Sequence, residues 1–392
     1  MEIKKWVGKI HCGDTLEVLR QMPDEFVDCI ITSPPYWGLR DYGIEGQIGL
    51  EPTLEEYLEK MLAVTAELKR VLKPTGVCFW NHGDSYGGSA SQGYGGRSND
   101  DFYGGLHAHG KKRPIKREKC LNLQNYRLIL RMIDEQGWIL RNILIWHKPN
   151  HMPSSVKDRF TNAYEPVFML VKNKEYWFDL DAVRVPHSRD WWNEQWAKRY
   201  GAKGDKSTVE HLKDNNPAKL HGGQRAIGEC YSPLGKNPGD VWSIPTQPFP
   251  EAHFATFPER LVEPMIKAGC PQWICKKCGK ARERMVEREV GYQASSAPDP
   301  NYQRIRPGGN SRPISEFMKQ ALSTKRYTIG WTDCGCNAGW RPGIVFDPFM
   351  GSGTVAKVAT RLRRQWIGIE LNPEYVEMAY RRLDGTQLEM FA

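Results

Sequence analysis

The run Ile344-Val345-Phe346-Asp347-Pro348-Phe349-Met350-Gly351-Ser352-Gly353-Thr354 decides the fold class of this chain. Its apolar first residues predict a short buried strand, and the turn-forming pair Asp347-Pro348 predicts where that strand ends. The two glycines that follow predict a tight turn in which backbone amides can approach a ligand closely. After the turn, apolar residues recur at the spacing of one helix face, at Val355, Ala356, Val358, Ala359 and Leu362.

A second strand with an acidic end follows this helix. The segment 365–370 is largely apolar as far as Glu370, and Asn372-Pro373 are the N-cap and first residue expected of another helix. A βαβ unit with a glycine-rich turn and a later acid is typical of nucleoside-binding sites, where the carboxylate accepts hydrogen bonds from ribose hydroxyls. The turn lacks a third glycine and any basic residue, which argues against a dinucleotide or Walker-type phosphate site. A purely structural turn is the alternative.

A second candidate site lies near the start of the chain, at Thr32-Ser33-Pro34-Pro35-Tyr36-Trp37. The preceding residues 26–31 predict a buried strand, which the two prolines must end. Open α/β sheets bind ligands at the carboxyl ends of their strands. There the Ser33 hydroxyl and a rigid carbonyl can accept hydrogen bonds from an exocyclic amino group, and the Tyr36 ring can stack on a base. The alternative is a strand-ending turn with a buried tyrosine.

Composition favours a folded protein with a basic surface. The chain of 392 residues has 55 Lys and Arg against 46 Asp and Glu, which gives a formal charge of +9, and it contains 14 Trp and 16 Tyr. Cations for phosphates and rings for bases suit a nucleic-acid binder, although a mildly basic surface over an aromatic core is an equal alternative. No apolar run approaches the roughly 18–20 residues of a membrane span, and the first residues contain no apolar signal core. These features argue against a membrane or secreted protein.

Half of the ten cysteines fall in one late stretch, between Cys270 and Cys336. Within it, Cys275-Lys276-Lys277-Cys278 has the spacing of a knuckle that wraps a tetrahedral metal, and Cys334-Gly335-Cys336 forms a tighter second pair. The pattern predicts a structural Zn²⁺ site made of Cys275, Cys278, Cys334 and Cys336. The alternative is that one pair is a fortuitous turn and that no metal binds.

Together these motifs resemble those of the amino-type DNA methyltransferases, which transfer a methyl group from S-adenosylmethionine to an exocyclic nitrogen. The Ser33–Tyr36 element comes before the Asp347–Thr354 element, which resembles the β-group motif order of that family. Further similar segments are His11 to Asp14, His253 to Glu259, Trp146 to Pro149 and Tyr164 to Pro166. The resemblance covers roughly residues 6–82, 120–180 and 240–270 and the C-terminal segment.

The resemblance implies an α/β, Rossmann-like methyltransferase with a mostly parallel, doubly wound sheet and a circularly permuted motif order. It implies that the target base is flipped out of the duplex and that its nitrogen attacks the methyl group directly. The catalytic residues would be Ser33, Pro34, Pro35 and Tyr36. The cofactor would lie against Asp14, Thr256, Phe257, Asp347, Pro348, Phe349, Gly351, Gly353, Thr354 and Glu370.

Ser33 bears on the choice of base. Family members with serine before the two prolines typically methylate cytosine N4, and those with Asp or Asn typically methylate adenine N6. We therefore expect a cytosine-N4 enzyme, with adenine N6 as the alternative. An RNA or protein-amide methyltransferase is also compatible with these motifs, as is a non-catalytic zinc-ribbon DNA binder with a degenerate core.

Partners and location follow from the same resemblance. We expect double-stranded DNA as the partner. We expect the protein in the cytoplasm and its gene in a prokaryote or a phage, as in restriction-modification systems. A homodimer and a cognate restriction endonuclease stay open, and no code gives the recognition sequence from these residues.

The chain is predicted to be one split core with insertions. The catalytic half would span 1–180, with a glycine-rich and basic loop at 83–119. The cofactor half would span 241–271 and 342–392. A target-recognition region would occupy 181–240, and a zinc-ribbon-like insertion would occupy 272–341.

Overall fold

The computed structural model describes residues 2–41, 43–87, 119–186, 235–247, 257–290 and 324–391. The chain divides into two compact units. The first contains Met1–Ala182, Gly239–Arg282 and Cys334–Ala392, and the second contains Val183–Pro238 and Glu283–Asp333. The domain boundaries expected from the sequence stay predictions, and much of the predicted loop 83–119 and recognition region 181–240 lies outside the described residues.

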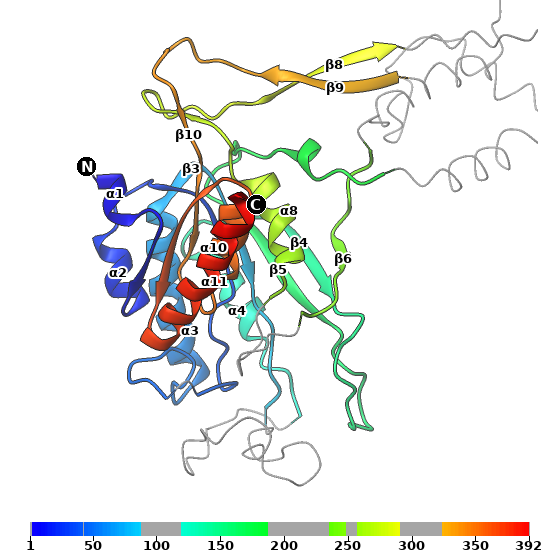
Figure 1. The fold of residues 1–392 in the computed structure, drawn as a ribbon. Helices are drawn as coiled ribbons and strands as arrows, with labels where there is room; N and C mark the ends of the chain where they lie inside the picture. The colour runs from blue at the N-terminus through cyan, green and yellow to red at the C-terminus, as the bar shows by residue number, and fades with distance from the viewer. Residues whose placement is uncertain are drawn as a thin grey trace, which may run out of the picture. The chain divides into compact units, whose positions relative to one another are not determined.

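An eight-stranded sheet forms the centre of the first unit (Figure 1). Its strands are β1 (Lys9–Cys12), β2 (Val27–Thr32), β3 (Leu72–Asn81), β4 (Ile139–His147), β5 (Tyr164–Val171), β6 (Val241–Ser243), β11 (Ile344–Asp347) and β12 (Gln365–Glu370). Their spatial order is β1-β12-β11-β2-β3-β5-β4-β6, and among them β5 alone runs antiparallel to its neighbours. The mostly parallel sheet predicted from the sequence is confirmed, and within it β12 and β11 from the C-terminal part of the chain lie between β1 and β2 from the N-terminal part.

Helices cover both faces of this sheet, as in doubly wound folds. One hydrophobic cluster joins the sheet to α1 (Glu2–Trp6), α2 (Thr15–Gln21), α3 (Leu54–Val71) and α4 (Gln124–Asp134). The other joins it to α8 (Glu259–Gly269), α10 (Thr354–Arg361) and α11 (Pro373–Phe391). Successive side chains of a strand point to opposite faces of its sheet, so β2 contributes to both clusters. Ile30 packs into the first cluster, whereas its neighbours Cys29 and Ile31 pack into the second. Because every residue of β2 is buried, the strand lies in the middle of the core.

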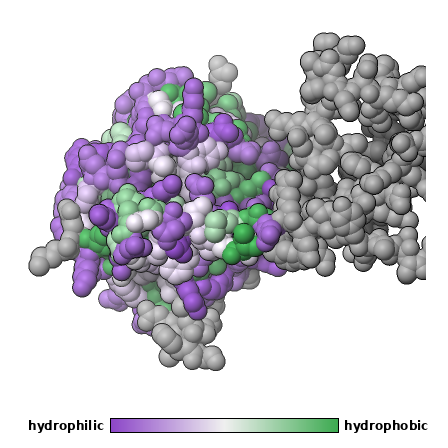
Figure 2. All heavy atoms as spheres, turned by 90° about the horizontal axis from the view of Figure 1, so that it is seen from above, coloured by the Kyte–Doolittle hydropathy of each residue, from purple (hydrophilic) through white to green (hydrophobic). Residues whose placement is uncertain are grey.

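Smaller elements complete the described structure. A short 3₁₀ helix, η4, spans Leu180–Ala182. In the first unit, β7 (Ile274–Cys275) pairs antiparallel with β10 (Trp340–Arg341). In the second unit, β8 (Arg284–Val290) pairs antiparallel with β9 (Thr324–Trp331). No helix among the described residues is long and apolar enough to cross a membrane. Figure 2 shows a largely hydrophilic face with small apolar areas.

Candidate active site

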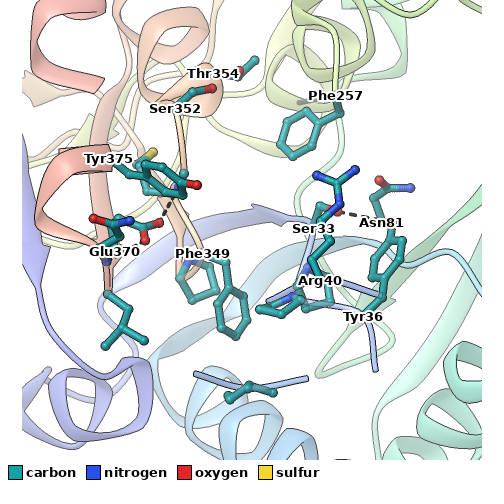
Figure 3. Close-up of a pocket in the computed structure, with 18 of the residues that line it drawn as sticks. Ser33, Tyr36, Arg40, Asn81, Phe257, Phe349, Ser352, Thr354, Glu370 and Tyr375 are labelled. Atoms are coloured by element: carbon teal, nitrogen blue, oxygen red, sulfur yellow. Dashed lines mark hydrogen bonds between the residues drawn. The ribbon is translucent and has the colours of Figure 1, made fainter. Parts of the chain in front are cut away.

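A cavity of about 380 Å³ lies at the carboxyl ends of the parallel strands and brings the two sequence motifs together. Ser33 to Tyr36 line one side of it, directly after β2, and Pro348 to Ser352 line another, directly after β11. Glu370, the last residue of β12, lines it as well. Figure 3 shows Ser33 and Tyr36 on one side of the cavity and Glu370 and Tyr375 on the other. The motifs are more than 300 residues apart in the sequence, and parallel pairing of β2 with β11 joins them.

The Ser33–Tyr36 loop carries a chain of polar contacts. The Ser33 and Tyr36 hydroxyl oxygens are 3.4 Å apart, and the Tyr36 hydroxyl donates to Glu165 Oε2 at 3.3 Å. Glu165 also forms an ion pair with Lys148, whose ammonium lies 4.3 Å from the centre of the Trp146 ring. Burial, together with the charge of Glu165, raises the pKa of Tyr36. The phenol therefore stays protonated at neutral pH and acts as a hydrogen-bond donor.

A buried histidine supports this loop through a tyrosine. Trp80 Nε1 donates to His82 Nδ1 at 3.3 Å, so the ring proton of the neutral imidazole sits on Nε2. His82 Nε2 lies 3.2 Å from the Tyr57 hydroxyl, which donates to the Pro35 carbonyl at 2.8 Å. Burial lowers the pKa of His82 to about 3, so that the imidazole is neutral near pH 7. These three hydrogen bonds orient the Pro35 carbonyl toward the Tyr57 hydroxyl.

A glycine lets Tyr36 pack closely. A Cβ on Gly83 would lie 2.8 Å from the Tyr36 ring, and the His82 ring centre is 5.1 Å from that of Tyr36. A larger residue at position 83 would push the tyrosine ring out of place. The loop is therefore held by the residues that directly follow β3 as well as by its prolines.

Glu370 closes the glycine turn on the other side of the cavity. One of its carboxylate oxygens accepts from the Gly351 N–H at 2.8 Å, and the other accepts from the Asn372 N–H at 2.9 Å. Each oxygen has a second lone pair for a ligand hydroxyl. Burial raises the pKa of Glu370. The rings of Phe349 and Tyr375 line the same cavity (Figure 3), so a carboxylate and two aromatic rings surround one ligand-sized space.

Asp347, the last residue of β11, is absent from the lining of the cavity. Its side chain is 1% exposed and accepts from Thr32 Oγ1 at 2.7 Å and from the Phe349 N–H at 3.0 Å. Burial raises its pKa to about 7. Asp347 thus ties the residue before Ser33 to the glycine turn, whereas the sequence led us to expect direct contact with a cofactor.

The other predicted cofactor residues divide into three groups. Asp14, Phe257, Pro348 and Thr354 line the cavity, and Asp14 also caps α2 by accepting from the Glu17 N–H at 3.0 Å. Gly353 does not line it; a Cβ there would lie 2.9 Å from Ala379, so this glycine permits close packing of α10 on α11. Thr256 lies outside the described residues.

Several lining residues were missed by the sequence reasoning. Asn81 ends β3 at the same edge as Ser33, and that position was a signal that could have identified it. Tyr375 stands in the first turn of α11, close behind Glu370. Arg40 belongs to an irregular loop after the two prolines, where no sequence pattern singles it out. Figure 3 shows Arg40 and Asn81 on the side of Ser33 and Tyr36.

The four cysteines of the predicted zinc site come together in the first unit. Their sulfur atoms all lie within 4.8 Å of one another. Backbone N–H groups of Cys278 and Lys277 lower the pKa of the Cys275 thiol to about 6, and the Lys277 N–H lies 3.4 Å from Cys275 Sγ. Tetrahedral zinc with bonds of about 2.3 Å needs sulfurs roughly 3.8 Å apart, which this cluster accommodates. None of the four lines the cavity.

This chain is similar to known DNA methyltransferases in sequence and in fold. The family model described as DNA methylase, of the N6/N4 class, matches residues 27–272 and 340–381. The type II methyltransferase M.Cfr9I of Citrobacter freundii is 33% identical, over 95% of this chain and 86% of the relative. M.XycI of Xanthomonas campestris pv. cyanopsidis is 33% identical over the same shares. Among solved structures, the cytosine-N4-specific PvuII DNA methyltransferase shares the fold, with a TM-score of 0.51 and 18% identity over 96% of this chain and 89% of that one.

Proposed function

This chain belongs to the N6/N4 family of DNA methylases and is an S-adenosylmethionine-dependent DNA methyltransferase, and we propose that its target is the N4 amino group of cytosine in duplex DNA. The observation that carries the cytosine assignment is Ser33, which stands directly before Pro34-Pro35 and lines the cavity. In the family, serine at this position typically accompanies cytosine N4 as the methyl acceptor. Adenine N6 is the alternative target.

Ser33 and the Pro34 carbonyl would hold the amino group of the flipped base. Both residues line the cavity, whereas the Pro35 carbonyl is already engaged by Tyr57. Hydrogen bonds from the amino group to these two acceptors draw the nitrogen out of conjugation with the ring and direct its lone pair toward the methyl group. As the nitrogen forms its bond to the methyl carbon, the bond from that carbon to the sulfonium sulfur would break and leave S-adenosylhomocysteine. The nitrogen would then release one of its protons to solvent. Catalysis on this scheme comes from orientation and electrostatics.

Tyr36 would bind the flipped base by stacking. Its ring is held by His82 and Gly83 on one side, and its hydroxyl by Glu165. Arg40 and Asn81 line the cavity beside it and carry N–H donors of the kind that the N3 and O2 acceptors of cytosine need. These side chains provide a rigid face and polar edges for a base that has left the stack.

The opposite side of the cavity suits the cofactor. S-adenosylmethionine, when bound, supplies an electrophilic methyl group on its sulfonium. The remaining lone pairs of the Glu370 carboxylate would accept hydrogen bonds from ribose hydroxyls. Phe349 and Tyr375 would contact the adenine, and Asp14, which also lines the cavity, would contact its polar edge. The acid at the strand end and the rings beside it support this assignment.

Replacing Tyr57 by Phe should slow methyl transfer without weakening cofactor binding. Tyr57→Phe removes the hydroxyl that donates to the Pro35 carbonyl at 2.8 Å, so the Ser33–Tyr36 loop loses a hydrogen bond that orients it. We expect kcat to fall roughly tenfold, because small misplacements of reacting groups are costly, while the Kd for S-adenosylmethionine is unchanged. Tyr176→Phe is the matched control, since its hydroxyl accepts from Arg141 at 3.1 Å and does not line the cavity. Equal kcat values for both variants would contradict the supporting role of Tyr57.

We also propose that Cys275, Cys278, Cys334 and Cys336 hold a structural zinc ion. The proposal is supported by the mutual approach of the four sulfurs within 4.8 Å and by the N–H groups aimed at Cys275. The ion would join segments far apart in sequence that also meet in the pairing of β7 with β10 and in a hydrogen bond from the Lys276 N–H to the Gly339 carbonyl at 3.1 Å. Metal binding can thereby contribute directly to folding.

Elemental analysis of the purified, unchelated protein should find about one zinc ion per chain, the number that four thiolate ligands hold. Cys278→Ser should lower the zinc content and the melting temperature together. Cys120→Ser is the control, because Cys120 is an exposed thiol outside the cluster. A wild-type protein free of zinc would refute the metal site.

Sequencing of modified bases tests the proposed target. DNA from cells that express this chain should carry N4-methylcytosine at one recurrent sequence, which would give the recognition site at the same time. If adenine alone were modified, the target would be adenine N6 and the cytosine assignment would be wrong. Duplex DNA is the proposed partner inside the producing cell, and a cognate restriction endonuclease and a homodimer stay predictions.

A further inference from the structure

The loop between β4 and β5, residues 148–163, carries the most exposed aromatic side chain of the described structure. Phe160 is 97% exposed, and Met152 on the same loop is 73% exposed. Scattered single apolar residues are normal on protein surfaces. Here Val156 and Tyr164 add two more exposed apolar side chains, at 39% and 53%, to one short segment. This concentration calls for a partner that covers it.

The loop begins and ends at the active-site cavity. Lys148, at its start, and Glu165, just beyond its end, both line the cavity. The Lys148 N–H donates to the Ala163 carbonyl at 2.7 Å, and Asn150 exchanges two hydrogen bonds with Thr246. Figure 1 shows the loop extending beyond the carboxyl ends of the strands. Because an extended chain covers about 3.4 Å per residue, Phe160 is at most about 17 Å from Glu165.

Two exposed cations precede Phe160 on the same loop. Lys157 and Arg159 are exposed on the same loop, and the one acid among them, Asp158, is paired with Lys119 at 2.8 Å. The Arg159 guanidinium lies 3.9 Å from the centre of the Tyr86 ring, and Tyr86 also donates to Asn162 at 3.4 Å. Tyr86 thereby supports the loop, and the exposed Phe160 follows two exposed cations in the sequence.

From these observations we infer that Phe160 is a wedge that enters the base stack of duplex DNA beside the flipped target base. The inference deepens the proposed function and rests on it. Apolar side chains of DNA-bending proteins insert between base steps in this way, and cations beside them neutralise phosphates. A base that leaves the duplex for the cavity leaves a gap, and filling it offsets the cost of unstacking. Because Phe160 lies at most about 17 Å from Glu165 in the cavity lining, it is close enough to contact the duplex near that gap.

Two matched duplexes test this role in the full-length protein. One contains the recognition sequence with a normal target pair, and in the other the target base faces an abasic site. Phe160→Ala should lower kcat/KM about tenfold or more on the paired duplex, the size expected when an aromatic stacking partner is lost. On the abasic duplex it should stay within about twofold of wild type, because that base is already unpaired. Leu130→Ala, which removes a 59% exposed side chain on α4, should behave as wild type on both.

Three results would overturn the wedge. One is a wild-type rate for Phe160→Ala on the paired duplex. Another is an equal loss on both duplexes, which would make Phe160 a general DNA contact. The third is a change of the protein from dimer to monomer on sedimentation with methylation unaltered, which would make Phe160 a contact between two copies of this chain. If the wild-type protein produced N6-methyladenine, only the cytosine assignment would be wrong. The ratio of the variant's kcat/KM to that of wild type on the two duplexes would still test the wedge.

Discussion

Ser33→Ala is expected to reduce methyl transfer roughly 100-fold or more while the protein still binds both its cofactor and DNA. The hydroxyl lines the cavity 3.4 Å from the Tyr36 hydroxyl, directly after the strand that ends at Thr32. Removing one positioned polar group from a preorganised site typically costs about 10²–10³ in rate. Single-turnover transfer of a labelled methyl group to duplex DNA measures the loss.

The controls separate chemistry from folding. Ser243→Ala is a matched change on β6 that removes a hydroxyl 3.1 Å from His147 and outside the cavity lining. It should retain the wild-type rate. Calorimetry should give Ser33→Ala and wild type the same Kd for S-adenosylmethionine. Full activity of Ser33→Ala would remove the serine from the chemistry.

Glu370→Ala is expected to weaken S-adenosylmethionine binding by about 10- to 100-fold, since hydrogen bonds to a charged acceptor contribute about 1.5–3 kcal/mol. The carboxylate accepts from the Gly351 and Asn372 N–H groups and has lone pairs left for ribose hydroxyls. At saturating cofactor, kcat should change little. Glu374→Ala, an exposed acid outside the cavity lining, is the matched control. An unchanged Kd for Glu370→Ala would contradict its assignment.

The pH dependence of cofactor binding gives the same assignment a second readout. Burial raises the pKa of Glu370 above its ordinary value. The ionised form is the stronger acceptor, so cofactor affinity should fall as pH decreases through this raised pKa. Glu370→Gln cannot ionise and should lose that dependence between neutral and mildly acidic pH. Titration calorimetry at several pH values measures both proteins.

Sequence patterns could predict the strand-end motifs because local chemistry creates them. The prolines of Ser33–Tyr36 end a strand wherever they occur, and the glycines of 351–353 favour a turn. Both motifs then had to reach the same edge, since parallel strands place their carboxyl ends together. The pairing of β2 with β11 fulfils that expectation.

The supporting residues could not be predicted in the same way. The role of Asp347 depends on Thr32, which lies 315 residues away and becomes its neighbour only in the folded sheet. Tyr57 reaches the Pro35 carbonyl from a helix, and His82 reaches Tyr57 from the end of a strand, but nothing in their own segments marks them as partners. No pattern in the sequence singles out Phe160, and its significance depends on an exposure that only the structure gives.

Nucleoside analysis of methylated DNA tests the central claim most directly. Purified protein is incubated with unmodified duplex DNA and S-adenosylmethionine that carries an isotopically labelled methyl group, and the DNA is digested and separated by mass spectrometry. The proposed chemistry predicts labelled N4-methylcytosine, with Ser33→Ala giving little or none under the same conditions. Labelled N6-methyladenine as the sole product would contradict it.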